Sequence, residues 1–104
     1  MRILVVEPDK NPYVKEITGS LESMQDIVGG LIEAVYPFKD NVALICNDEG
    51  KILNLPWNRF IVYDMRNYDV IAGTFFICSC PPDGESFESL SDEQIEKYSS
   101  IFEL

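Results

Sequence analysis

The sequence contains no histidine among its 104 residues. Histidine is the commonest general base in enzymes, a frequent zinc ligand, and the usual partner of nucleophilic serine or cysteine. Without histidine, acid–base catalysis would have to use carboxylates, and two of these must converge in a cleft before they can act together. We therefore predict that the protein is not an enzyme, and we expect no cofactor.

Cysteine is scarce, and the three cysteines, Cys46, Cys78 and Cys80, lie within or beside apolar runs. An odd set in such surroundings is typical of buried, reduced thiols rather than of a disulfide framework. Cys78 and Cys80 share one side of an extended strand, but a structural zinc site takes four ligands and one thiol remains to join them. We expect no metal site, and we predict a cytoplasmic location.

Long apolar runs are missing too, since no stretch approaches the roughly 18 to 20 apolar residues that cross a bilayer. Basic residues are few: the chain has eight Lys and Arg and 18 Asp and Glu, which gives a net charge of -10. A chain this acidic repels phosphate backbones and anionic lipid and attracts basic partners. The charge therefore argues against direct nucleic-acid or membrane binding and favours a basic protein partner.

Apolar residues make up 46% of the chain, which is ordinary for a globular protein, and we expect one domain over residues 1–104. Two helices and five or six short strands are too few βαβ units for a doubly wound sheet. The prediction is an α+β fold, a mostly antiparallel sheet with both helices packed on one face. Extended patterns cover residues 2–7, 13–17, 31–36, 42–46, 52–55, 60–63 and 70–78.

Serine residues mark the start of both helices. Ser20 precedes the first apolar stripe, and Gly29 and Gly30 are expected to end that helix. Ser91 opens the second helix and has capping-box spacing to Gln94. The order of helix then glycine pair is the reverse of a phosphate-binding loop, so we interpret the pair as a helix stop.

The segment Trp57-Asn58-Arg59, which follows Pro56, is the strongest candidate for recognition. Tryptophan and arginine are common binding hot spots, and a guanidinium can hold a carboxylate or phosphate with two bonds. The alternative is structural, with Arg59 paired to a local acid and Trp57 in the core. The turn Asn47–Gly50 is the next candidate, although it lacks the length of a calcium loop.

Several segments in this order resemble a known family: residues 3–8, 28–33, 47–50, 55–59 and 71–74. The family is domain-of-unknown-function family 3846, small acidic proteins of phages, plasmids and conjugative elements of Gram-positive bacteria. The resemblance implies no established activity. It does imply that Glu33, Asn47, Asn58 and Arg59 are candidate site residues, since they match polar positions of the family. Trp57 departs from the pattern, which has an aliphatic residue there.

Three functional hypotheses follow. The first is a noncatalytic accessory protein of a mobile element that binds a protein partner, which the charge predicts to be basic. The second is capture of a small anionic, nucleotide-like ligand by Arg59 with Asn47 and Asn58. The third is an acidic mimic of nucleic acid, built on the acid-rich residues 81–104, whose simpler interpretation is a solvated helix face.

The proposed N-cap gives a first test. Replacing Ser91 with alanine is expected to lower the free energy of unfolding by about 1 kcal/mol, because an orphan amide of the first helical turn loses its acceptor. Denaturant unfolding and amide exchange measure the effect. Unaltered amide protection in residues 92–95 would refute the cap.

Overall fold

The computed structural model describes residues 1–62, 68–83 and 86–104. Its helices and strands are β1 (Arg2–Val6), β2 (Tyr13–Glu16), α1 (Leu21–Val28), β3 (Ile32–Val35), β4 (Val42–Asn47), β5 (Trp57–Val62), β6 (Tyr68–Ala72), β7 (Phe75–Ser79) and α2 (Asp92–Phe102). Five strands form an antiparallel sheet in the order β2-β1-β7-β4-β3, while β5 and β6 pair as a separate antiparallel ribbon. The predicted α+β class is confirmed.

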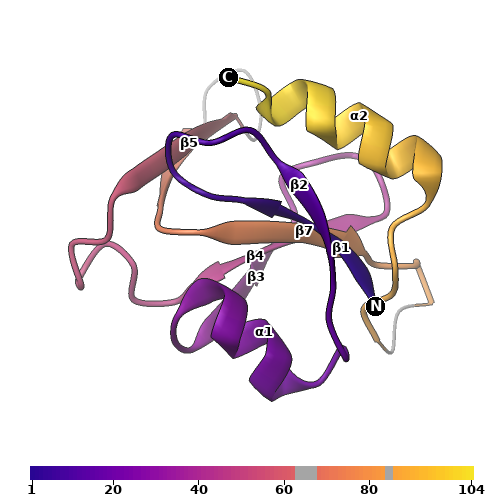
Figure 1. The fold of residues 1–104 in the computed structure, drawn as a ribbon, viewed down its shortest axis with the longest axis horizontal. Helices are drawn as coiled ribbons and strands as arrows, with labels where there is room; N and C mark the ends of the chain where they lie inside the picture. Colours follow the sequence, from indigo (N-terminus) through magenta and orange to yellow (C-terminus); the bar gives the residue numbers. More distant parts are fainter. Residues whose placement is uncertain (63–67, 84–85) are drawn as a thin grey trace.

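The two helices cover opposite faces of the sheet (Figure 1). Along β1, Ile3 and Val5 pack in the cluster that contains α1, whereas Leu4 and Val6 pack in the cluster that contains α2 and the β5–β6 ribbon. The prediction that both helices lie on one face is therefore wrong. A strand that is apolar at every position, as β1 is, is buried on both sides, and each side needs its own cover.

The predicted helix ends are confirmed. The Ser20 side chain accepts a hydrogen bond from the Ser23 amide, and Gly29 ends α1 in the left-handed region at φ 79°. At α2 the Ser91 hydroxyl accepts from the Gln94 amide at 3.1 Å, and the Gln94 side chain accepts from the Ser91 amide at 2.9 Å. Both helices thus begin where local sequence chemistry places them.

The apolar run at 70–78 is two strands instead of the predicted one. The break lies between β6 and β7 at Gly73, whose φ of 86° ends the extended run. The carbonyl of Gly73 also accepts a bond from the Asn58 side chain at 2.9 Å. With this split, the described residues form seven strands, above the predicted five or six.

The predicted strand at 52–55 is a turn. The Leu53 amide donates to the Glu49 carbonyl at 2.9 Å and the Leu55 amide to the Gly50 carbonyl at 3.0 Å. Asn54 has a φ of 56°, which an extended strand does not accommodate. Ile52 is 79% exposed, so the apolar residues of this segment lie at the surface and do not form a buried strand.

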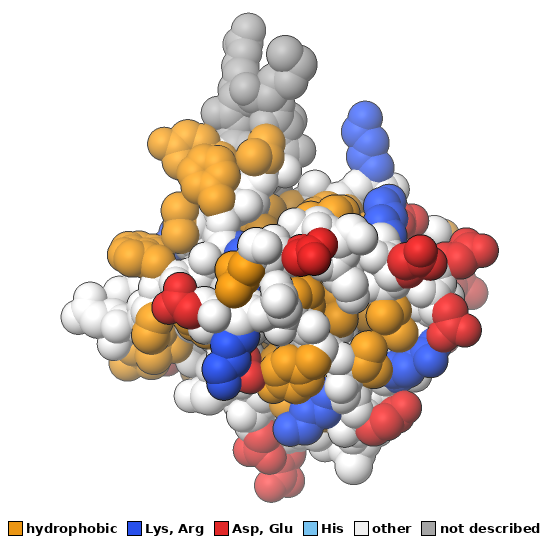
Figure 2. Space-filling model, turned by 45° about the horizontal axis from the view of Figure 1, so that its top comes forward, with side chains coloured by type: hydrophobic (Ala, Val, Ile, Leu, Met, Phe, Trp, Pro, Cys, Tyr) orange, Lys and Arg blue, Asp and Glu red, His pale blue; other side chains and the backbone are white. Residues whose placement is uncertain are grey.

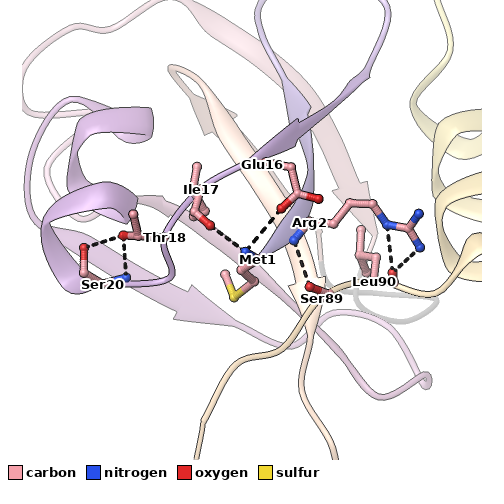
Figure 3. A network of polar contacts seen from close by, with 8 residues as sticks. All are labelled: Met1, Arg2, Glu16, Ile17, Thr18, Ser20, Ser89 and Leu90. Carbon is pink, nitrogen blue, oxygen red and sulfur yellow. Dashed lines mark hydrogen bonds and ion pairs between the residues drawn. The ribbon is translucent and has the colours of Figure 1, made fainter.

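A polar network ties β1 to its neighbours (Figure 3). The Met1 ammonium donates to the Ile17 carbonyl at 2.5 Å and pairs with Glu16 at 3.4 Å. The Arg2 guanidinium donates to the Leu90 carbonyl at 2.9 Å, just before α2 begins. The start of β1 therefore fixes both the end of β2 and the segment that leads into α2.

Candidate functional site

The predicted recognition segment lies in an irregular part of β5. The pairing with β6 shifts between Trp57 and Phe60, so Asn58 and Arg59 together lie opposite a single residue of β6. Two residues against one is a β-bulge, a device that redirects side chains. Here it directs the two polar side chains towards the main sheet and α2.

The guanidinium of Arg59 is bound on all sides by protein oxygens. Nε and Nη2 donate to the carbonyl of Phe102, the last residue of α2, at 3.1 and 2.7 Å. Nη2 also donates to the Lys10 carbonyl at 2.6 Å, and Nη1 to the Glu7 carbonyl at 3.4 Å. Burial lowers the pKa of Arg59, while the charge of Asp9 opposes this. An incoming anion would have to displace these bonds.

Asn58 completes the same contact. Its side-chain amide donates to the Val6 carbonyl at 2.8 Å and to the Gly73 carbonyl at 2.9 Å, and its oxygen accepts from Arg59 Nη1 at 2.9 Å. We call Asn58 and Arg59 the clasp. It joins β5 to the end of β1, to Gly73 between β6 and β7, and to the end of α2.

Asn47 does not join the clasp. It is 6% exposed, its amide donates to the Val28 carbonyl at the end of α1 at 3.2 Å, and its oxygen accepts from the Glu49 amide at 2.8 Å. Asn47 thus binds the end of α1 while Arg59 binds the end of α2, on the other face of the sheet. The anion site predicted from Arg59 with Asn47 and Asn58 is not assembled in this geometry.

Glu33 borders a pocket of about 330 Å³ beside β3, β4, β6 and the turn after β4, and Asn47 lines the same pocket. The walls carry four acidic residues and one lysine over an apolar floor. Residues that line the pocket include Glu33, Val35, Cys46, Asp48, Glu49, Lys51, Ile52, Asp69, Val70 and Ile71. That Asp48 and Asp69 line one pocket could not be predicted from the sequence, because it depends on how the ribbon packs.

Carboxyl groups converge at this pocket. Burial raises the pKa of Glu33, and a hydrogen bond and the charge of Asp48 raise it further, with a smaller contribution from Asp69. Lys51 opposes the shift, and it also forms an ion pair with Asp69. Burial and the nearby acids likewise raise the pKa of the Cys46 thiol to about 11. The pocket is therefore a region of negative potential.

The side of the ribbon away from the clasp carries an apolar surface, of which only Trp57 was predicted as a site residue. Trp57, Phe60, Val62 and Tyr68 are between 57% and 66% exposed, while Ile61 between them is buried. Phe60 and Tyr68 stack with ring centroids 4.8 Å apart. We call these four exposed residues the outer face. Figure 2 shows hydrophobic side chains gathered at the upper left, at the end of the molecule where β5 lies in Figure 1.

One signal in the sequence could have located the outer face. Phe60, Ile61 and Val62 are consecutive apolar residues, and a two-stranded ribbon can bury one side only. Trp57 joins Phe60 on the exposed side because the bulge shifts the alternation by one residue. That shift is invisible in the sequence.

The cysteines show no common site. All three are free thiols; Cys46 packs in the cluster on the α2 face, and Cys78 and Cys80 pack on the α1 face. Among residues 1–62, 68–83 and 86–104, no group of three or more Cys, Asp or Glu could hold a metal ion. In the same part of the chain, none of the helices is long and apolar enough to cross a membrane.

Comparison with known proteins gives a match over nearly the whole chain. The family described as Domain of unknown function (DUF3846) matches residues 1–103. No curated protein and no solved structure matches.

The clasp predicts that Arg59 stabilises the fold, through main-chain oxygens instead of the local acid named in the structural alternative. Arg59→Ala is expected to lower the free energy of unfolding by about 3 kcal/mol, because charge-assisted bonds to several main-chain oxygens are lost. Urea unfolding measures this. Lys39→Ala, at an exposed position, is the control and is expected to change stability by less than about 0.5 kcal/mol. Equal stability of the two variants would contradict the structural role.

Glu33 gives a pH-dependent prediction. Its pKa is raised in the folded protein, so the stability this group contributes falls as pH rises through the folded pKa. Glu33→Gln is therefore expected to stabilise the fold at neutral pH by less than about 1 kcal/mol, since the side chain is largely exposed. Thermal unfolding across pH tests this. The gain should vanish below pH 4.5, the ordinary pKa of the group; a gain that persists there would have another cause.

Proposed function

The chain belongs to the DUF3846 family, and from its geometry we propose that it is a noncatalytic accessory protein of a mobile element that acts by binding a protein partner. The observation that carries the proposal is the outer face. Four large apolar side chains stand more than half exposed on one side of a two-stranded ribbon, and two of them are stacked aromatic rings. Clustered exposed aromatics are typical of interaction surfaces.

The ribbon is suited to this role because its position is fixed. The clasp holds it from beneath through main-chain oxygens, and Ile61 and Ile71 anchor it in the core. A rigid surface loses little conformational entropy when a partner binds. The residues of the outer face therefore lie on a strand pair whose position is fixed before a partner binds.

The other hypotheses have less support. An anionic ligand at Arg59 would have to compete with the carbonyl oxygens that already accept hydrogen bonds from its guanidinium. A carboxylate enzyme would use Glu33 and Asp48, yet both side chains are exposed to water, where charge stabilisation is weak. The acidic mimic would use exposed acids of α2, such as Glu93 and Glu96, whose solvated face equally explains solubility.

The mobile-element setting rests on the family resemblance, and the cytoplasm is its proposed location. Two of the free thiols, Cys46 and Cys78, are buried. Burial raises the pKa of Cys78 to about 12, which disfavours the reactive thiolate. These properties suit a reducing compartment.

Trp57→Ser tests the function. The substitution is expected to leave the free energy of unfolding within about 0.5 kcal/mol of wild type, because the ring is 64% exposed, but to abolish partner capture from host lysate. Quantitative pull-down with mass spectrometry measures capture. Leu21→Ser, at a 57% exposed site on α1, is the matched control and should retain every partner. Equal capture by both variants would refute binding through the outer face.

A further inference from the structure

The outer face and the acidic pocket are neighbours on β6. Val70 borders the pocket and is also the direct cross-strand partner of Phe60. Side chains directly opposite in an antiparallel pair lie about 5 Å apart, so Val70 connects the two regions. Ile52, which is 79% exposed, extends the apolar surface along the pocket wall. A partner on the outer face therefore also meets the pocket.

The residues that border the pocket carry an excess of negative charge. The pocket is bordered by Glu33, Asp48, Glu49 and Asp69 against Lys51, so four negative charges face one positive charge, a formal balance of -3. Lys51 is already paired with Asp69. The charge of Asp48 raises the pKa of Glu33, so the two carboxylates repel each other, and both line the pocket that Val70 borders.

Charge complementarity selects the occupant. A second copy of the chain would bring another net charge of -10, and nucleic acid would bring phosphates, so both are repelled. A protein segment with lysine or arginine beside apolar residues satisfies both regions at once. The partner's apolar groups cover the outer face, and its cation relieves the carboxylate repulsion.

We propose that the partner docks on the outer face through an apolar segment flanked by a lysine or arginine, whose charged end lies between Glu33 and Asp48. This inference rests on the proposed function and adds the chemistry of the partner. The pocket, at about 330 Å³, has room for such a side chain. The apolar lining residues Val35, Val70 and Ile71 suit the aliphatic stem of a lysine or arginine, which packs on apolar surface while the charge stays near water.

The probe is a displayed library of short random peptides, selected on wild-type protein and resynthesised for affinity measurement. Three variants are compared: Phe60→Ser on the outer face, the pair Glu33→Gln with Asp48→Asn in the pocket, and the pair Glu93→Gln with Glu96→Gln on α2. The two pairs remove equal charge, so the α2 pair controls for long-range electrostatics. Circular dichroism and unfolding confirm that each variant folds.

We expect selected peptides to combine aromatic or aliphatic residues with lysine or arginine. Their affinity should be lost in Phe60→Ser, should fall about tenfold or more in the pocket pair, and should change far less in the α2 pair. A tenfold loss corresponds to about 1.4 kcal/mol.

Peptides that need Phe60 but bind the pocket pair as tightly as wild type would overturn this inference and leave the proposed function standing. Equal weakening by both charge pairs would overturn it as well, since only net charge would matter. No enrichment of Phe60-dependent peptides would overturn the inference and the outer face together. Self-association of the wild type that Phe60→Ser abolishes, measured by sedimentation, would make a second copy the occupant.

Discussion

The attachment of the β5–β6 ribbon to the main sheet and α2 depends on the guanidinium of Arg59. Arg59 donates to main-chain oxygens at the end of α2 and in the turn after β1. Its neighbour Asn58 donates to the carbonyl at the end of β1 and to the carbonyl of Gly73, in the break before β7. Without these bonds the β5–β6 ribbon would meet the sheet mainly through Ile61 and Ile71. Apolar contacts are nondirectional, so they bury the ribbon without fixing its orientation. The hydrogen bonds supply the orientation.

The bulge in β5 gives the clasp and the outer face at the same time. One extra residue places Asn58 and Arg59 on the side of the sheet and returns Phe60 to the side that Trp57 occupies. A regular strand would alternate through these positions and would leave one of the two polar side chains facing solvent. The same irregularity therefore separates a structural side from an exposed apolar side.

The helix ends could be predicted from the sequence, whereas the turn at 52–55 and the contacts between distant segments could not. Ser20, Gly29 and Ser91 set helix ends through bonds within one turn, so their pattern was sufficient. Gly73 packs closely against Leu55, Asn58 bonds to Val6, and Arg59 bonds to Phe102. These contacts join residues that are remote in sequence. The pocket at Glu33 needs Asp48 and Asp69 from separate elements, and only the packed ribbon brings them together.

The alternation along β5 also bears on how this surface can be varied. Ile61 is buried, whereas Trp57, Phe60 and Val62 contribute mainly exposed area, so changes at these three positions leave the core and the clasp intact. Exposed substitutions away from such contacts cost little stability. In the proposed function, substitutions at these positions would alter the surface offered to a partner and would keep the bonds that hold the ribbon. The exposed apolar residues and the residues that fix the ribbon are thus different positions of a single strand, so each set can be varied separately by mutagenesis.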